Sequence, residues 1–269
     1  MLAAIVKEVT MSLNKKQIRA GVGELSKELS ITVYKKIDST NTQAKLAAEA
    51  GCTEKAIFIA SEQTAGRGRL GRSFSSGKDK GLYLSILIGK ELPADFGTAL
   101  TTYMAVIATR AIARLTSIDP KIKWVNDVYA GGKKLAGILT EGKAKSEGTL
   151  AYAVVGIGIN LLRQDFPDDV KAIATTVEDE CGAVVDVNEL TALIVKEFFG
   201  NLHLVGTPEL AEEYRSRSFL IGERVNVIKP TTTYEATVKN ITDKCELLLE
   251  LADGTEEVLC TGEVSVRKI

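Results

Sequence analysis

Three arginines in one short, glycine-rich segment are the residues best suited to do chemistry. The segment 62–72 reads EQTAGRGRLGR and closely follows the apolar run 56–60. Its arginines are Arg67, Arg69 and Arg72, and its glycines are Gly66, Gly68 and Gly71. Glycine lets a backbone approach a ligand closely, and guanidinium groups are permanently charged forks that match phosphate or carboxylate oxygens. We therefore expect residues 62–72, here called the arginine loop, to bind an anion.

The arginine loop admits two other interpretations. Its letters satisfy G-x-G-x-x-G, the dinucleotide-binding fingerprint, but that fingerprint needs a helix that opens at the last glycine. The chain continues as SFSSGKDKG, which is too polar and glycine-rich for such a helix. A surface loop whose arginines are merely solvated stays open as an alternative on this segment alone.

Two further segments join polar groups to the ends of strands. Segment 38–41 (DSTN) lies where a strand feeds a helix, and it offers hydroxyl and amide groups beside free N–H donors. An ordinary helix cap is its plain alternative. Segment 123–127 (KWVND) presents a cation, the only tryptophan and an Asn-Asp turn, and its alternative is a turn around a buried aromatic side chain.

Two more segments lie on apolar strands. Segment 133–139 (KKLAGIL) places lysine at the entrance of a strand, from which its charge can be aimed into a cleft of low dielectric. Segment 155–160 (VGIGIN) alternates glycine with apolar residues, so one face of the strand lacks side chains. Such a strand is weakened unless something packs flat against the bare backbone.

The composition narrows the class of protein. The chain has 269 residues, 45% hydrophobic and 26% charged, with a formal net charge of −1, so we expect a sizeable core and two domains but no basic surface for nucleic acid. The four cysteines form no C-x-x-C pair and His203 is the single histidine, which argues against a zinc site, a disulfide framework and a histidine-activated nucleophile. We see neither a signal peptide nor an apolar run of roughly 20 residues, so a cytoplasmic protein without membrane contact is expected.

Hydrophobic periodicity divides the chain into three parts. Residues 1–30 predict a short helix and a connector, residues 31–218 alternate strands and helices, and residues 219–269 predict a small separate barrel of short strands. The middle part includes expected antiparallel strands at 122–125, 135–140 and 150–161, with turns at 126–132 and 142–148. These turns are too short for helical crossovers.

Capping and turn residues mark the ends of several elements. We expect Ser12 or Asn14 to cap the first helix and Asn188 to cap a helix that begins at 189. Pro208 should lie in the first turn of the next helix. The Asp-Gly pair at 253–254 predicts a hairpin turn.

Taken together, these segments resemble those of biotin protein ligases. The matching segments are 38–41, 63–72, 123–127, 134–139 and 156–160, followed by 262–267 (GEVSVR) in the expected barrel. The resemblance covers about residues 31–269. It implies an α+β fold, namely a mixed sheet flanked by helices and related to class II aminoacyl-tRNA synthetases, followed by an SH3-like β-barrel.

The resemblance also implies an activity and its partners. Such an enzyme activates biotin with ATP to biotinyl-5′-AMP and transfers the biotinyl group to a lysine of a biotin carboxyl carrier protein. Mg²⁺ would arrive with ATP, with Asp127 as a candidate neighbour and with no metal site of the protein's own. A homodimer is expected, because an edge strand of the sheet leaves N–H and C=O groups that a second copy can pair.

Roles follow for the residues that match. The residues that would line the biotin site are Ser39, Thr40, Asn41, Gln63, Gly66, Arg67, Gly68, Arg69, Lys134, Gly137, Gly156 and Gly158. The residues that would contact ATP or the adenylate are Arg67, Arg69, Arg72, Phe74, Lys123, Trp124, Asn126, Asp127, Lys134 and Asn160. Lys134, Arg67 and Arg69 would be catalytic, because they screen the repulsion between the biotin carboxylate and the α-phosphate and stabilise charge in the transition state.

Departures from the family pattern leave two alternatives in view. Val125 stands where proline is usual and Phe74 where many members have tryptophan, and residues 1–30 lack the winged helix-turn-helix of members that repress transcription, so no DNA partner is expected. A lipoate or octanoate ligase or transferase of the related fold is one alternative, although it would not be expected to carry the arginine loop together with 123–124 and 262–267. A non-catalytic sensor of biotinyl-AMP is the other, although it would not need Lys134.

Overall fold

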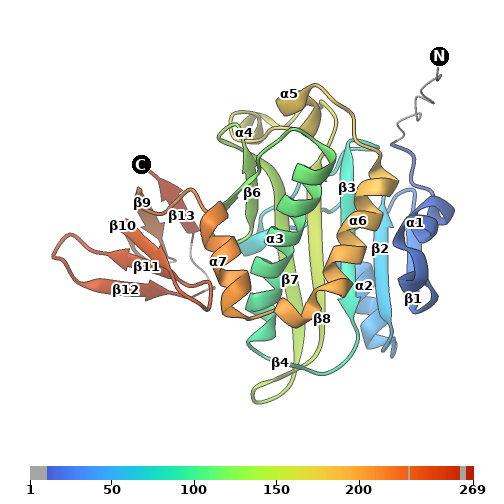
Figure 1. Cartoon of the computed structure of the whole chain (residues 1–269), viewed down its shortest axis with the longest axis horizontal. Coiled ribbons are helices and arrows are strands. Elements are labelled where there is room, and N and C mark those ends of the chain that lie inside the picture. Colours follow the sequence, from blue (N-terminus) through green and yellow to red (C-terminus); the bar gives the residue numbers. More distant parts are fainter. Residues whose placement is uncertain (1–10, 230, 261–264) are drawn as a thin grey trace.

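A computed structural model describes residues 11–229, 231–260 and 265–269. Its larger part is an eight-stranded sheet with helices on both faces, and its smaller part is a five-stranded antiparallel sheet beside it (Figure 1). The expected mixed sheet flanked by helices and the separate C-terminal β-structure are both present. The boundaries at 30/31 and 218/219 stay predictions.

The large sheet combines one parallel pair with antiparallel pairs. Its strands are β1 (Leu29–Tyr34), β2 (Lys55–Ala60), β3 (Gly81–Ile88), β4 (Leu92–Pro93), β5 (Lys121–Lys123), β6 (Asp127–Ala130), β7 (Lys133–Ser146) and β8 (Thr149–Asn160). They follow the order β1-β2-β3-β8-β7-β6-β5, with β4 paired to β8. β1 and β2 run parallel, whereas the other neighbours are antiparallel. The order places β8 and β7 in the middle of the sheet.

Two expected turns are largely strand, which corrects the sequence-based prediction. β6 occupies most of 126–132, and its side chains alternate between half-buried and buried positions. The chain turns instead at Gly131 and Gly132, which both have positive φ. β7 also continues to Ser146 through the expected turn at 142–148, because its exposed polar end stays paired with β8. A four-residue strand and a polar hairpin end carry little hydrophobic pattern, so neither was visible in the sequence.

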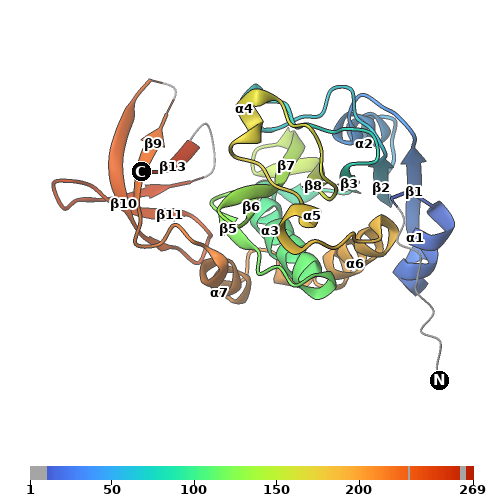
Figure 2. The same cartoon turned by 90° about the horizontal axis from the view of Figure 1, so that it is seen from above.

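Helices cover the two faces of the sheet unequally. The α-helices are α1 (Lys15–Val22), α2 (Thr40–Glu49), α3 (Phe96–Leu115), α4 (Asp168–Lys171), α5 (Val177–Cys181), α6 (Val187–Gly200) and α7 (Pro208–Arg217). α3 and α6 lie on one face and α2 on the other (Figure 2). By length and composition alone α3 could cross a membrane, but most of it is buried inside this fold, as expected of a core helix.

The helix caps agree with the sequence except at α6. Asn14 caps α1 and accepts hydrogen bonds from two backbone N–H groups of the first turn. Asp186, not Asn188, caps α6, which therefore begins two residues earlier than predicted. The Asn188 side chain instead donates to the carbonyl of Ser12 at 3.0 Å and accepts from the N–H of Asn14 at 2.7 Å. Asn188 thus links α6 to the start of α1.

The small sheet forms the C-terminal part. Its strands are β9 (Arg224–Ile228), β10 (Thr233–Ile241), β11 (Leu247–Glu250), β12 (Glu256–Leu259) and β13 (Ser265–Lys268), in the order β12-β11-β10-β9-β13. The predicted turn at 253–254 joins β11 to β12, with Gly254 at a φ of 82°. Pro208 is the first residue of α7, also as predicted.

A cluster of charges connects α7 to α3. Arg110 of α3 binds the Glu213 carboxylate through two nitrogens, one of them Nε at 2.9 Å, and Arg217 adds two more contacts, from Nε at 3.2 Å and from Nη2 at 3.0 Å. Burial by itself would raise the pKa of Glu213, but the hydrogen bonds from Arg110 and Arg217 outweigh it and lower that pKa. A carboxyl whose pKa is lowered on folding stabilises the folded state above its unfolded pKa, and this contribution is lost as the pH falls through the folded pKa.

We predict that Glu213→Gln lowers the free energy of unfolding by about 1–3 kcal/mol at pH 7. The difference from wild type should shrink as the pH falls below the unfolded pKa of the carboxyl and through its lower folded pKa, because the wild-type carboxyl then also becomes protonated. Urea unfolding at a series of pH values measures both effects. Glu212→Gln is the control, because Glu212 pairs with Arg215 but is 69% exposed, and its loss should be small. A pH-independent difference would contradict the proposed role of the Glu213 charge.

Candidate active site

Glycines of β7 and β8 form a strip without side chains on one face of the sheet, here called the glycine strip (Gly137, Gly156 and Gly158). Gly137 lies directly opposite Gly158, and Gly156 lies between Leu139 on β7 and Ser85 on β3. Residues that face each other across antiparallel strands share a face of the sheet. The glycine strip therefore crosses the two middle strands.

The protein's own side chains pack against the glycine strip. A Cβ atom at Gly156 would overlap the Asn41 amide, and one at Gly158 would overlap the Phe74 ring, both well inside 3.0 Å. From the sequence we expected a group to pack flat against the bare backbone of β8, and we expected that group to be the ring of a ligand. A ligand ring could reach the backbone of Gly158 only if Phe74 moved.

A chain of hydrogen bonds connects the start of α2 to the sheet. The Gln63 Oε1 atom accepts from the Thr40 N–H at 2.8 Å. Ser85 Oγ lies 2.7 Å from Thr40 Oγ1 and donates to Asn41 Oδ1 at 2.6 Å. The Asn41 amide then donates through Nδ2 to Glu141 at 3.0 Å. Five residues from α2, β3, β7 and the arginine loop are held together in this way.

Glu141 of β7 collects three donors. Its side chain is 18% exposed and contacts Lys45 at 2.8 Å and Arg67 at 2.9 Å, besides Asn41. Burial by itself would raise the pKa of Glu141, but the bonds from Lys45 and Asn41 and the charge of Arg67 outweigh it and lower that pKa. Glu141 is therefore a carboxylate at neutral pH.

Two arginine side chains of the loop contact β7 and the turn between β5 and β6. Arg67 reaches Glu141, and Arg69 Nη1 donates to Asn126 Oδ1 at 3.2 Å. Within the loop, the Gly68 N–H donates to the Arg72 carbonyl at 2.7 Å, and Arg72 itself is exposed. Burial lowers the pKa of Arg69, and the nearby Asp127 opposes that shift. Two of the three arginines thus point back to the sheet.

Lys134 lies at the Gly137 end of the glycine strip. Its Nζ is 2.7 Å from Asp127 Oδ1, and Asp127 is paired with Gly137 across β6 and β7. Segment 173–175 holds the lysine backbone through two hydrogen bonds, one of 2.8 Å to the Ile173 carbonyl and one of 2.9 Å from the Thr175 N–H. The ammonium group, a carboxylate and the Phe74 ring therefore meet at this end.

Three other predicted residues lie farther from the glycine strip or point elsewhere. Asn160 ends β8 and donates to the Thr175 carbonyl at 3.1 Å, while its buried Oδ1 has no partner among the described residues. Trp124 is 5% exposed, and its indole N–H donates to the Cys245 carbonyl of the C-terminal part at 2.9 Å. Lys123 lies over the Tyr129 ring at 5.5 Å.

Ser39 and Gly66, which were also predicted for the site, have little free space around them. Ser39 is buried and precedes α2 without a side-chain cap bond. A Cβ atom on Gly66 would lie 2.5 Å from the Phe74 carbonyl and from Ser76 Oγ, so that position requires glycine. Residues 262–264 of the C-terminal motif lie outside the described residues. Among the residues that the structure describes, no group of three His, Cys, Asp or Glu side chains is arranged for a metal ion.

Four site residues were missed by the sequence analysis: Ser76, Ser85, Lys45 and Glu141. Two had a usable signal. Alternation along β7 from Gly137 through Leu139 puts Glu141 on the face of the glycine strip. Lys45 follows Asn41 by four residues, so both lie on one side of α2. Ser85 had no such signal, because its partners Thr40 and Asn41 are more than 40 residues away. Ser76 had none either, because its bonds with Phe74 and Gln63 depend on how the chain folds between β2 and β3.

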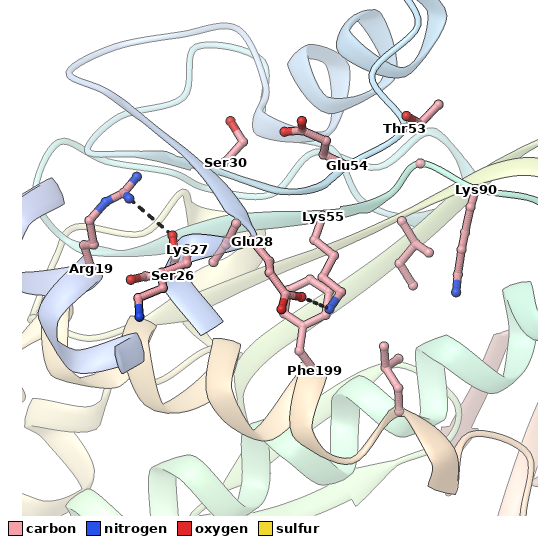
Figure 3. A pocket seen from close by; sticks show the side chains of 14 residues that line it. Arg19, Ser26, Lys27, Glu28, Ser30, Thr53, Glu54, Lys55, Lys90 and Phe199 are labelled. Carbon is pink, nitrogen blue, oxygen red and sulfur yellow. Dashed lines mark hydrogen bonds and ion pairs between the residues drawn. The ribbon is translucent and has the colours of Figure 1, made fainter. Parts of the chain in front are cut away.

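A separate hollow of about 610 Å³ is lined by residues at the starts of β1 and β2 and at the end of β3 (Figure 3). The arginine loop lies between the end of β2 and the start of β3, so the hollow is at the other end of these strands. Its charged groups are largely paired, as in the 3.0 Å contact between Lys55 and Glu28. None of the predicted site residues line it, so it is not the candidate site.

The chain is similar to known proteins along most of its length. The model of the biotin/lipoate A/B protein ligase family matches residues 33–160, and that of the biotin protein ligase C-terminal domain matches residues 220–267. A Paracoccus denitrificans protein named biotin–[acetyl-CoA-carboxylase] ligase is 34% identical over 240 residues, which are 84% of this chain and 96% of that protein. A Mycobacterium tuberculosis protein of the same name is 30% identical over 261 residues, which are 94% and 93%.

A solved structure has the same fold. The biotin protein ligase from Aquifex aeolicus in complex with biotin and ATP superimposes with a TM-score of 0.75 at 28% identity, covering 89% of this chain and 99% of that one. The predicted fold class is confirmed: the large sheet with its helices is the class II aminoacyl-tRNA synthetase-like part, and the small sheet is the SH3-like part.

The packing on the glycine strip can be tested by adding one methyl group. We predict that Gly156→Ala lowers the free energy of unfolding by about 1–3 kcal/mol, because the buried Asn41 amide must leave its bonds with Ser85 and Glu141. Gly200→Ala in the last turn of α6 is the control, since a Cβ atom there meets nothing within 4 Å. Chemical denaturation compares the two variants. An unchanged Gly156→Ala protein would show that the amide can shift freely.

Proposed function

This chain belongs to the biotin protein ligase family, and we infer that it activates biotin with ATP to biotinyl-5′-AMP and then biotinylates a lysine of a biotin carboxyl carrier protein. The observation that carries this function in the structure is the gathering of cations at the glycine strip. Lys134 lies at its Gly137 end, and Arg67 reaches the neighbouring Glu141. The names of the two relatives give acetyl-CoA carboxylase as the acceptor of biotin. We propose a biotin-dependent carboxylase as the partner of this chain.

The reaction requires two anions to approach each other. The biotin carboxylate attacks the α-phosphate of ATP, pyrophosphate leaves, and the product is a mixed anhydride. The amine of the acceptor lysine then attacks the anhydride carbonyl, loses a proton and releases AMP. In the first step we assign Lys134 and the loop arginines to the charges of both reactants, because fixed cations cost no reorganisation when the transition state forms.

Asp127 gives Lys134 a defined position before any ligand arrives. The 2.7 Å ion pair restricts the flexible lysine stem, and both side chains are less than one third exposed. An ammonium group carries three donors, so the ion pair leaves donors for the carboxylate and the phosphate. We therefore propose that Lys134 bridges the two reactants while it keeps Asp127.

The neutral end of biotin is assigned to the hydrogen-bonded groups beside α2. The Ser39, Thr40 and Gln63 side chains supply donors and acceptors that suit a ureido group. Thr40 is 4% exposed and Ser39 is 2% exposed, so these groups are already shielded from water. Phe74 would then cover the ring, after moving away from the backbone of Gly158.

The nucleotide is assigned to the arginine loop and the ends of β5 and β8. The unpaired Oδ1 of Asn160 is a buried acceptor that fits an exocyclic amino group. Mg²⁺ fits this site as an ion carried by the phosphates, since Asp127 offers one carboxylate and such ions keep several waters. When bound, it would neutralise phosphate charge, and Asp127 is the carboxylate that would help to hold it.

A lipoate or octanoate enzyme of the same wider family is less well supported. The catalytic family model is shared with those enzymes, but residues 220–267 match a biotin-specific C-terminal model. We also propose a cytoplasmic location, where ATP is available, without a membrane or DNA partner.

We predict that the protein with ATP, Mg²⁺ and labelled biotin exchanges pyrophosphate and labels an added carrier domain. Lys134→Ala should reduce pyrophosphate exchange by at least about 100-fold, because it removes a charge at the reacting atoms and no core volume. Lys133→Ala is the matched control, since Lys133 is the exposed neighbour on the same strand. Exchange within about tenfold of wild type in Lys134→Ala would remove Lys134 from the mechanism. Adenylate formation without transfer would favour a biotinyl-AMP sensor.

We further propose a homodimer that pairs through β7. β6 covers β7 only as far as Gly137, so residues 140–146 have no strand on their outer side among the described residues. Lys143 and Lys145 lie on this segment and would oppose pairing, but each has an acidic partner within the chain, Glu49 and Glu91. The open edge is thus nearly neutral.

Light scattering at micromolar concentration, with and without adenylate, should detect the dimer. Ala144→Glu should shift the protein toward monomer, because a two-fold axis brings both new charges to the same edge. Ala252→Glu, exposed in the turn between β11 and β12, should leave the dimer intact. A monomeric wild-type protein in both conditions would end the proposal.

A further inference from the structure

Glu141 is the most connected charged residue of the site, although it was not expected to touch either substrate. Its carboxylate contacts α2 through Asn41 and Lys45, and the arginine loop through Arg67. These contacts bring three segments that are far apart in the sequence to one pair of oxygen atoms.

We propose that Glu141 is a positioning residue for the activation of biotin, acting through Arg67. The proposal rests on the proposed function of this site. Glu141 holds one edge of the Arg67 guanidinium and leaves the remaining donors directed to the anionic groups of the substrates. It is not a catalytic residue, because its two oxygens are occupied by protein donors.

The hydrogen-bond donors of Arg67 are numerous enough to bind both Glu141 and a substrate. A guanidinium has five N–H donors in a rigid plane. Glu141 takes the Nη2 edge at 2.9 Å, and no other described side chain is bonded to Arg67, whose side chain is 43% exposed. An arginine on a glycine-rich loop would otherwise sample many rotamers, and ordering it would reduce the affinity for the substrate. Held by Glu141, the guanidinium is already oriented when the substrate arrives.

The charges near Glu141 do not cancel. One carboxylate faces two cations, Lys45 and Arg67, so the cluster keeps a net positive charge. Glu141 can therefore hold Arg67 without removing the attraction of this region for a phosphate or a carboxylate. A second neutralising carboxylate would have weakened that attraction.

Glu141 also orients the hydrogen bonds near the biotin end. A carboxylate only accepts hydrogen bonds, so the Asn41 amide must present its NH₂ group to Glu141 and its oxygen to Ser85. The Ser85 hydroxyl must then donate to Asn41 rather than to Thr40. Glu141 thus sets the direction of the Ser85 hydroxyl, which lies next to Thr40, through the Asn41 amide between them.

Glu141→Gln tests the proposal, because it keeps the shape of the side chain and removes its charge. We expect kcat/KM for ATP in pyrophosphate exchange to fall about ten- to hundredfold, the range for losing a hydrogen bond to a charged group, with most of the change in KM. Glu141→Asp should recover part of the activity. Glu257→Gln is the matched control, since Glu257 is also a half-buried carboxylate that binds a lysine, Lys229, but lies in the small sheet outside the site.

A double-mutant cycle identifies the residue through which Glu141 acts. In an Arg67→Gln background, Glu141→Gln should have little further effect on kcat/KM. Lys45→Met should lower kcat/KM less than Glu141→Gln does, because it removes one charge of the cluster but leaves the ion pair of Arg67 with Glu141 in place. Additive losses in the Arg67 cycle, or a Lys45→Met variant that reproduces Glu141→Gln, would overturn the proposal. So would a Glu141→Gln protein within threefold of wild type, provided that circular dichroism shows it to be folded.

A ligand-free measurement separates this proposal from the proposed function. Limited trypsin digestion should cut at Arg67, Arg69 or Arg72 several times faster in Glu141→Gln than in wild type, because the loop loses the contact that holds Arg67 to β7. Equal rates would overturn the role of Glu141 even if the wild-type protein ligates biotin. If wild type shows no exchange, the proposed function fails, and the digestion still decides whether Glu141 holds the loop.

Discussion

The site depends on how closely α2 and the arginine loop approach the backbone of β7 and β8. Side chains on the strands would hold both segments away, and the glycine strip removes that obstacle. Asn41 fills the space over Gly156 and Phe74 fills the space over Gly158. Close approach then lets Asn41 bond to Glu141 and brings Arg67 within reach of the same carboxylate. The geometry of the cations therefore follows from missing Cβ atoms.

Each central cation already has a protein partner. Arg67 pairs with Glu141, Lys134 with Asp127, and Arg69 donates to Asn126. Unpaired cations at these half-buried positions would repel one another and lose solvation. The partners allow the cations to be gathered before a substrate is present, and the donors that remain are available to it. Substrate binding then adds contacts without assembling the site.

The C-terminal part contacts the turn after β5, and this turn carries two residues of the site. The Trp124 indole donates to the Cys245 carbonyl, and the Tyr214 hydroxyl of α7 donates to the Val125 carbonyl at 3.1 Å. Both contacts are buried, and the next two residues are the partners of Arg69 and Lys134. The small sheet and α7 thus restrict the turn that carries Asn126 and Asp127. Trp124 contributes to the site from inside the core, through its neighbours.

Local patterns in the sequence were sufficient to predict much of this protein. The arginine loop, the alternating glycines of β8, Lys134 at the start of β7 and the cap at Asn14 depend on residues close together in the chain, where glycine, charge and periodicity act directly. The class of fold and the family also followed from these segments in order. Short or polar elements escaped, as β6 and the end of β7 show, because their strand pairing leaves almost no hydrophobic pattern.

Only the tertiary structure decided which side chain caps α6, which one packs against β8 and which ones bind Glu141. Asp186 and Asn188 both suit a helix cap, and α1 settles the choice because it engages the Asn188 side chain. The bare backbone of β8 demanded a flat neighbour, but the fold supplied Asn41, whose amide reaches the Leu139 carbonyl 98 residues away in sequence. Glu141 likewise gained its role from Lys45 and Arg67, which lie on other elements. Such partnerships depend on strand register and helix placement across the whole sheet, and no local pattern in the sequence encodes them.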